Sequence, residues 1–484
     1  MNLYELTAHQ LSDKLKAKEI SSTEITKSVI KRIENVEKKV ESYITTTYDL
    51  ALETAKKVDE KIAKGEEIAP LEGIPMAIKD NICTKGIPTT CASKILKNFK
   101  PPYNATAYEK LFCADAILLG KLNMDEFGMG STTENSAFKL TKNPYDLTKV
   151  PGGSSGGSAA SVAANEAFFS LGSDTGGSIR QPAALCGCVG LKPTYGTVSR
   201  YGLVAFSSSL EQIGPITKDV RDAAIVLNVI AGYDKMDSTS STFKHPDFEA
   251  SLTGNIKGVK IGIPKEFIPS DINPEVLSSF KTAINNLSAA GASYYDTSFP
   301  LNDYALPVYY IISSVEASSN LSRFDGIKYG YCTKNFSNLH ELYSKTRSKG
   351  FGQEVKSRIM LGTFALTSER CRDYYDKALK IRRMISDEFS KKFSDFDVLV
   401  TPAYYDTAHN FGEGSHDPTK MYKSSVLNVA VNIAGLPAIV VPCGYDKAGL
   451  PIGIQIIGKP FSESTILNVA YTLEKTITKC PPRL

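Results

Sequence analysis

The chain has 484 residues, of which 42% are hydrophobic and 22% are charged, as is typical of a soluble globular protein with a large core. Its net charge is 56 − 52 = +4, which is too small for binding nucleic acid by charge alone. No stretch offers the roughly 18 apolar residues of a membrane span, and the N-terminus lacks the pattern of a secretory signal. We therefore expect a cytoplasmic protein without a membrane segment.

Histidine and cysteine give no sign of a metal site. The five histidines never approach a ligand spacing such as H-x-x-x-H. The nine cysteines are odd in number and contain no C-x-x-C, which argues against a zinc site and a disulfide framework. Cys186 and Cys188 form the one close pair, which we interpret as packed thiols. We expect reduced cysteines, no metal and no cofactor in this chain.

The first 65 residues read as helices. Thr7-x-x-Gln10 and Ser21-x-x-Glu24 each match a capping box, in which two side chains satisfy free backbone donors at a helix start. A third helix is predicted over about 50–64. We expect residues 1–65 to form a helical layer that packs on the core without folding independently, and residues 66–484 to form one large domain. After the second cap, apolar residues recur near a period of 3.6 and mark a buried stripe: Ile25, Val29, Ile33 and Val36.

Beyond Gly65, short apolar runs alternate with helical patterns. Strands interleaved with helices over several hundred residues predict an α/β fold with a large sheet covered by helices on both faces. The polar stretch 234–242 is expected to be a surface loop, because no repeat or long linker divides the chain. The predicted strands are 74–78, 116–119, 167–171, 259–263, 398–400, 438–441 and an alternating strand at 452–456.

Two clusters of glycine and serine mark a candidate site. Residues 151–158 read PGGSSGGS and residues 172–178 read GSDTGGS, with small helix-compatible residues and an apolar run between them. A flexible linker would also explain such composition, but linkers are not normally interrupted by a buried helix and strand. Glycine-rich turns at the ends of core elements let backbone donors converge, and both clusters supply serine hydroxyls.

Several chemistries fit these clusters poorly. A phosphate-binding P-loop needs a lysine after its last glycine, and Gly157 is followed by Ser158. Residues 153–157 formally match the G-x-S-x-G nucleophile elbow, but the preceding segment is polar and only His409 or His416 remains to complete a triad. Asp174 begins a D-T-G sequence, but no second D-[ST]-G exists to share a proton.

Without a well-placed histidine, a serine nucleophile needs another base. A lysine serves if desolvation or a positive field lowers its pKa from about 10.4 towards neutrality. Lys79 directly follows the apolar run 74–78 and is therefore a candidate, although a lysine after a strand is usually a solvated loop charge.

Three motifs together resemble the amidase signature family. They are Gly73-Ile-Pro-x-Ala-Ile-Lys79-Asp80, the cluster at 152–158, and the cluster at 172–178 continued by Ile-Arg180-Gln-Pro-Ala. The resemblance spans nearly the whole chain and narrows to the A subunits of tRNA-dependent Asp/Glu amidotransferases. It implies a large mixed β-sheet covered by helices. The narrower motifs lie at 122–130, 134–137, 304–310, 316–320, 323–326, 350–352, 358–363 and 434–437.

The resemblance implies a Ser–cis-Ser–Lys triad. Ser178 would be the nucleophile, Lys79 the final base, and Ser154 the proton relay, following a cis peptide bond from Gly153. An oxyanion hole would then be formed by the backbone N–H groups of Thr175, Gly176, Gly177 and Ser178.

The resemblance also implies a substrate and partners. Glutamine would be the ammonia donor, with Arg358 binding its α-carboxylate and Tyr309 lining the pocket. Ammonia would pass to a partner B subunit, which uses ATP and Mg to activate misacylated Glu-tRNA or Asp-tRNA, while a C subunit wraps the interface of this heterotrimeric ligase complex. The alternatives are a stand-alone amidase on a small amide and a catalytically weak scaffold subunit.

One position departs from the family pattern. The family has an aspartate four residues after the methionine of a Met-Tyr pair, where it is expected to pair with the α-ammonium of glutamine. Here Met421 is followed by Ser425 at that spacing, with Lys423 nearby. Losing a buried charge partner commonly costs a few kcal/mol. Three hypotheses follow: the chain uses glutamine more weakly, it uses another amide donor, or the α-ammonium is bound instead by Ser424, Ser425 or another carboxylate.

Residues 323–349 mix six basic residues with three tyrosines and only two acidic residues. A solvated helical face explains this composition. The alternative hypothesis is a surface for tRNA or a partner subunit.

Overall fold

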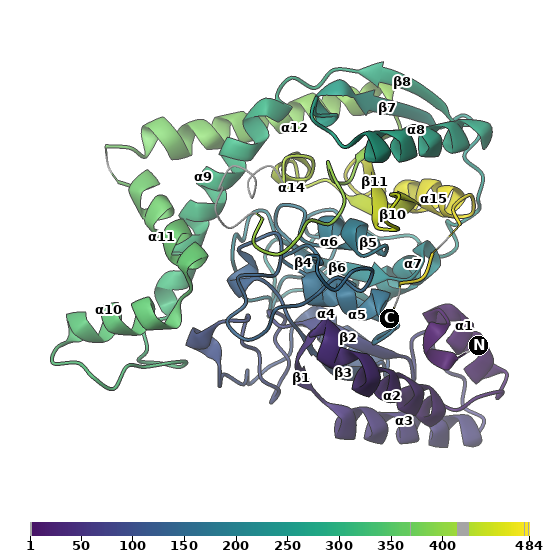
Figure 1. Ribbon diagram of the computed structural model, residues 1–484, viewed down its shortest axis with the longest axis horizontal. Coiled ribbons are helices and arrows are strands. Elements are labelled where there is room, and N and C mark those ends of the chain that lie inside the picture. The colour runs from purple at the N-terminus through teal and green to yellow at the C-terminus, as the bar shows by residue number, and fades with distance from the viewer. Residues whose placement is uncertain (1, 368, 414–424, 479, 483) are drawn as a thin grey trace.

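The computed structural model describes residues 2–367, 369–413, 425–478, 480–482 and 484. Within them, eleven strands form one mixed sheet in the order β1-β3-β2-β4-β6-β5-β10-β11-β9-β7-β8 (Figure 1). The expected α/β architecture is confirmed. The strands are β1 Tyr43–Thr46, β2 Pro75–Lys79, β3 Ile117–Leu122, β4 Phe169–Asp174, β5 Val189–Lys192, β6 Gln212–Thr217, β7 Lys260–Pro264, β8 Ser293–Thr297, β9 Val398–Pro402, β10 Ala438–Tyr445 and β11 Pro451–Gly458.

The seven predicted strands are confirmed as β2, β3, β4, β7, β9, β10 and β11. The expectation that residues 1–65 are all helical is wrong at one place, because β1 pairs antiparallel with β3 at the edge of the sheet. The sequence also missed β5, β6 and β8. The strands β5 and β6 carry glycine and proline (Gly190, Gly214, Pro215), which normally weaken a strand, while β8 is mostly exposed and lacks an apolar run.

In Figure 1, two helices of the N-terminal segment, α2 Ser22–Val40 and α3 Tyr48–Ala63, lie below β2 and β3, and a third, α1 Ala8–Lys16, lies further to the right beside α2. Both capping boxes are present, at Thr7 with Gln10 and at Ser21 with Glu24. The predicted stripe on α2 is buried throughout. Since this segment also supplies β1, it shares the central sheet with the rest of the chain.

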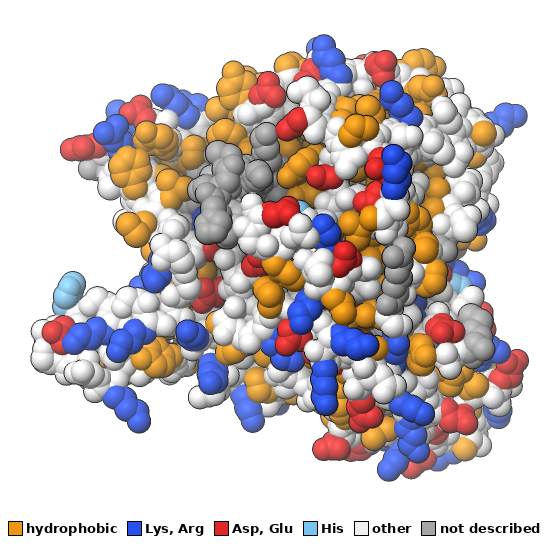
Figure 2. Space-filling view, in the orientation of Figure 1, with side chains coloured by type: hydrophobic (Ala, Val, Ile, Leu, Met, Phe, Trp, Pro, Cys, Tyr) orange, Lys and Arg blue, Asp and Glu red, His pale blue; other side chains and the backbone are white. Residues whose placement is uncertain are grey.

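Several of the later helices pack on the sheet, whereas α9, α10 and α11 lie outside it. In Figure 1, α10 and the loop before it extend from the body at the lower left, and Figure 2 shows lysine and arginine side chains along this arm. No helix among the described residues is long and apolar enough to cross a membrane. These helices are α4 Thr106–Cys113, α5 Gly156–Ala163, α6 Arg180–Leu185, α7 Val220–Ile230, α8 Pro274–Ala289, α9 Asn302–Asn320, α10 Leu339–Gly350, α11 Gln353–Ala365, α12 Lys377–Asp395, α14 Val429–Ile433 and α15 Glu463–Glu474.

Candidate active site

Lys79 is the last residue of β2 and is completely buried. Because β2 and β4 are parallel neighbours, their carboxyl ends lie at the same edge of the sheet, and Lys79 Nζ lies 3.3 Å from Ser173 O. The ammonium donates to Ser154 Oγ at 2.7 Å and to Ser155 Oγ at 2.8 Å. Burial lowers the pKa of Lys79 to about 7, although Asp125 and Asp174 oppose this shift. A substantial fraction of neutral amine, the form that can accept a proton, is therefore present near neutral pH.

The turn that carries Ser154 connects to α5. Its peptide bond from Gly153 to Ser154 is cis, as the resemblance implies. The N–H of Gly153 donates to Gln181 Oε1 at 2.9 Å, and Gln181 Nε2 donates to Ser131 O at 3.1 Å. The backbone N–H of Ser155 donates to Ser178 O at 3.2 Å, which joins this turn to the second glycine-rich segment. The two clusters predicted from the sequence therefore meet in one site.

Ser178 lies between β4 and α6, in the segment that follows Asp174. It is 8% exposed and lines a pocket. Of the four backbone groups expected to form an oxyanion hole, the N–H of Gly177 donates to Asp174 Oδ1 at 2.8 Å. Gly177 has a φ of +119°, a conformation that suits glycine. The N–H of Gly177 is therefore already engaged within the turn that also carries the N–H groups of Thr175, Gly176 and Ser178.

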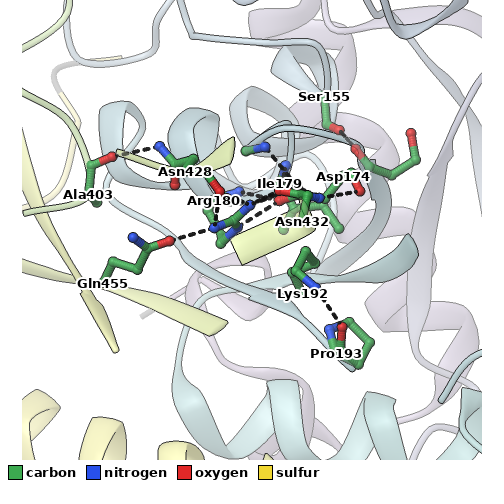
Figure 3. Close-up of polar contacts among 12 residues, drawn as sticks. Ser155, Asp174, Ile179, Arg180, Lys192, Pro193, Ala403, Asn428, Asn432 and Gln455 are labelled. Atoms are coloured by element: carbon green, nitrogen blue, oxygen red, sulfur yellow. Dashed lines mark hydrogen bonds and ion pairs between the residues drawn. The ribbon is translucent and has the colours of Figure 1, made fainter. Parts of the chain in front are cut away.

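A buried ionic network around Asp174 and Arg180 holds this turn (Figure 3). Asp174 and Arg180 are both fully buried and form a two-pronged pair, with Nε to Oδ2 and Nη2 to Oδ1 each at 3.0 Å. Arg180 also donates to Gln455 Oε1 at 2.6 Å and to Asn432 Oδ1 at 2.5 Å. Burial alone would raise the pKa of Asp174, but the charge and hydrogen bonds of Arg180, the charge of Lys192 and a hydrogen bond from Asn432 Nδ2 hold it well below its usual range, so the carboxylate stays charged.

The other end of the pocket is built by helices. Tyr309 on α9 packs on Gly176, and Arg358 on α11 stacks over the ring of Tyr310 at 4.2 Å. Arg358 is 6% exposed; its Nε donates to Glu354 Oε1 at 2.6 Å, while its buried Nη1 has no hydrogen-bond partner among the described residues. The full lining of the pocket is Gly130, Ser131, Gly153, Gly176, Gly177, Ser178, Gln181, Tyr309, Tyr310, Arg358 and Ser425.

Ser425, the position that departs from the family pattern, lines this pocket and is partly buried. The neighbouring Met421, Lys423 and Ser424, which entered the sequence argument, lie outside the described residues. Among the described lining residues, Arg358 is the one charged side chain, and none is a carboxylate.

Sequence reasoning missed the residues that support the site. Ser155 contacts Lys79 as closely as Ser154 does, and its place beside Ser154 in the glycine-rich motif was the available signal. Gln181 follows the second cluster directly, but nothing local showed that it would reach Gly153 and Ser131.

One group of described residues could hold a metal ion, and it joins His9 to Asp219 and Asp222 far along the chain. Their sequence positions gave no hint of this grouping. Asp222 already accepts the N–H groups of Ala8 and His9 at the start of α1, and His9 Nδ1 lies 2.9 Å from Asp222 Oδ1. These contacts assign the cluster a structural role in seating α1 on α7.

A buried lysine beside two serine hydroxyls, with a third serine in an adjoining pocket, is typical of serine hydrolases that use lysine in place of histidine as the base. The model of the amidase family matches residues 24–467. The chain therefore belongs to the amidase family and is an enzyme of that family, as the motifs predict.

Relatives within the family sharpen the comparison. The chain is 57% identical over 475 residues to the A subunit of glutamyl-tRNA(Gln) amidotransferase from Desulforamulus reducens, covering 98% of each chain. It is 54% identical over 486 residues to the protein of the same name from Carboxydothermus hydrogenoformans, covering 100% of both. The crystal structure of the corresponding protein from Thermotoga maritima matches with a TM-score of 0.83 and 39% identity, covering 100% of this chain and 98% of the other. The predicted resemblance to the A subunits of amidotransferases is confirmed.

Proposed function

We propose that this chain is the glutaminase subunit of a heterotrimeric, tRNA-dependent amidotransferase that works in the cytoplasm. The proposal is carried by the hydrogen bond from buried Lys79 to Ser154, at 2.7 Å, in a site that opens on the pocket containing Ser178 and Arg358. Relatives with 54–57% identity over the full chain, all named as the A subunits of amidotransferases, support the same function.

The proposed reaction begins with glutamine in the pocket. Neutral Lys79 takes the hydroxyl proton of Ser154, which takes the proton of Ser178, and the Ser178 oxygen attacks the side-chain amide carbon. The tetrahedral oxyanion accepts hydrogen bonds from backbone N–H groups of the turn at 175–178. The proton held by Lys79 then returns through Ser154 to the amide nitrogen, and ammonia leaves. Water attacks the resulting ester by the same route and releases glutamate, which restores Ser178.

The proposed substrate contacts lie at the helical end of the pocket. The buried Nη1 of Arg358 has no partner within the described part of the chain, which suits a carboxylate, and Tyr309 forms an adjacent wall. The ammonia would be used by a B subunit that binds ATP and Mg and presents Glu-tRNA(Gln) or Asp-tRNA(Asn), with a C subunit covering the interface. The basic arm around α10 is a candidate surface for the partner chains or the tRNA.

A weakened glutaminase is the second candidate, and Ser425 favours it. With no carboxylate among the described lining residues, the α-ammonium of glutamine would lack the charge partner that the family pattern supplies. The remaining alternative, a stand-alone amidase, would hydrolyse simple amides without partner chains, and this activity distinguishes it from the other two candidates.

The decisive experiment is to trap the covalent intermediate. The complex is mixed with glutamine, quenched in acid, and examined by intact mass and peptide mapping. A glutamyl adduct on the peptide containing Ser178 is expected. An adduct on another residue, or glutamine turnover without any adduct in wild type and unchanged in Ser178→Ala, would exclude the proposed nucleophile.

A further inference from the structure

Asp125 lies beside the reacting groups, although the motif comparison gives it no role. It is fully buried and precedes the short helical turn Glu126–Gly128. A side chain at either Gly130 or Gly153 would collide with its carboxylate, so glycine at both positions allows this close approach. A buried carboxylate is costly unless its hydrogen bonds and neighbouring charges compensate, which makes its surroundings informative.

Asp125 joins two loops of the active site. Its backbone N–H donates to Ser154 O at 3.2 Å. Its carboxylate accepts the N–H of Thr133 at 2.9 Å and the N–H of Asn135 at 3.1 Å. The loop that it organises runs through Ser131, which lines the pocket.

Thr133 completes the connection to the serine turn. Its hydroxyl donates to Gly152 O at 2.8 Å and accepts the N–H of Gly156 at 3.1 Å, so it bridges the two ends of the turn that carries Ser154. Asp125 is therefore linked to the Ser154 turn in two ways: directly, by its backbone N–H to Ser154 O, and indirectly, by its carboxylate through Thr133.

The negative charge of Asp125 also acts on the pKa of Lys79. Of the groups whose charges raise the pKa of Lys79, Asp125 has the largest effect, followed by Asp174, Cys91 and Glu211. Asp174 is already paired with Arg180. Burial, and to a smaller extent Glu134, raise the pKa of Asp125 to about 7, while the Thr133 and Asn135 hydrogen bonds and the Lys79 charge favour its ionised form. The carboxylate is therefore mostly charged above about pH 7, the range in which Lys79 is mostly neutral and can accept a proton.

We propose that Asp125 is a positioning residue for the Ser–Lys chemistry: its carboxylate fixes the turn that presents Ser154, and its negative charge stabilises the ammonium form of Lys79 that arises during attack. This rests on the proposed function. The proton balance is that of the proposed reaction, with the Ser178 proton passing to Ser154 and the Ser154 proton to Lys79. Asp125 takes no proton in this step; its charge lowers the energy of the Lys79 cation.

The test follows the labelling of Ser178 by a fluorophosphonate probe, which replaces fluoride with the serine oxygen, in the complete complex between about pH 5 and 9. In wild type, labelling should rise through a pH near the Lys79 pKa of about 7. In Asp125→Asn, loss of the negative charge should move this rise lower by about one pH unit and slow labelling about tenfold on the plateau. Glu166→Gln is the matched control, because Glu166 is equally buried and its carboxylate instead accepts from Ser42.

The outcomes separate the possibilities. A wild-type complex that does not label at Ser178 overturns the proposed function itself. Labelling in which Asp125→Asn and wild type rise at the same pH overturns the role of Asp125, provided that both melt at similar temperatures. Should Asp125→Asn not fold, Thr133→Val decides: it should slow labelling without moving the pH of the rise, and wild-type rates would contradict the positioning role.

Discussion

The pocket has two ends that come from different parts of the fold. At the reacting end, Lys79 and the serine turns sit on the edge of the central sheet, where parallel β2 and β4 end side by side. At the other end, Tyr309 and Arg358 project from α9 and α11, outside the sheet. The reacting end is held by buried main-chain contacts, whereas α11 carries exposed Met360, at 73%, with Leu361 and Phe364 also exposed. The reacting end is therefore fixed by the chain's own buried contacts. At the recognition end, by contrast, α11 leaves apolar side chains exposed.

The largest effect is expected from removing the nucleophile. Ser178→Ala should lower glutamine-dependent amidation by the complex at least about a thousandfold, because the covalent route is lost. Amidation driven by added ammonia should stay at the wild-type rate, since it bypasses this site. Comparing the two ammonia sources in one preparation checks this. If the Ser178→Ala complex still carries out glutamine-dependent amidation as fast as ammonia-driven amidation, Ser178 is not the nucleophile.

The buried Asp174–Arg180 pair, which holds the turn at 175–178, should affect both the stability of the protein and the rate of glutamine hydrolysis. Asp174→Asn leaves the buried guanidinium of Arg180 without its charge partner, which typically costs about 3–5 kcal/mol of unfolding free energy. Gly177 and Ile179 donate to different oxygens of Asp174, and asparagine keeps only one oxygen, so one of these two N–H groups loses its acceptor and activity should fall further than stability alone explains. Denaturant unfolding and glutaminase assays measure the two effects.

Glu249→Gln is the matched control for this change. It removes the carboxylate of a more exposed pair with Arg221, at 2.8 Å, and should cost less than about 1 kcal/mol. Equal losses in Asp174→Asn and Glu249→Gln would mean that the buried network does not support the turn.

The two ends also differ in what the sequence could predict. An apolar run ending at Lys79 and two glycine–serine clusters are local patterns, so the sequence located the reacting groups. The partners of Arg180 were not predictable in this way, because Asn432 and Gln455 follow it by more than 250 residues and reach it only through the order of the strands. Arg358 was named only through a family motif, since nothing local shows that a helix from outside the sheet turns it towards Ser178.

The pH dependence should report on the reacting end. Lys79 must be neutral to accept a proton, and its pKa is lowered to about 7 by burial. Below that pH the ammonium form dominates, so kcat/KM for glutamine should fall about tenfold per pH unit as the pH decreases, and level off above it. A profile that is flat between about pH 5 and 7 would be inconsistent with Lys79 as the base.

At the recognition end, Arg358→Lys should act mainly on binding. The guanidinium offers a carboxylate two parallel donors, which an ammonium on a flexible chain cannot reproduce. KM for glutamine should rise about 10- to 100-fold with a smaller change in kcat. Arg383→Lys on α12 is the control, because Arg383 pairs with Asp387 at an exposed position outside the pocket. A fall in kcat at unchanged KM would instead place Arg358 in the chemical step.

The smallest expected effect is the most specific. Ser425→Asp adds a carboxylate to a pocket whose one charged described side chain is Arg358, so the zwitterionic end of glutamine would gain a partner for its ammonium. KM for glutamine should fall about tenfold, while the KM for glutaramate, the same amide without the α-ammonium, should not improve. Ser425→Asn adds similar volume without charge and should leave both values near wild type. A wild-type KM already in the usual range for glutaminases, unchanged by Ser425→Asp, would mean that another group binds the ammonium and that the recognition end is not weakened.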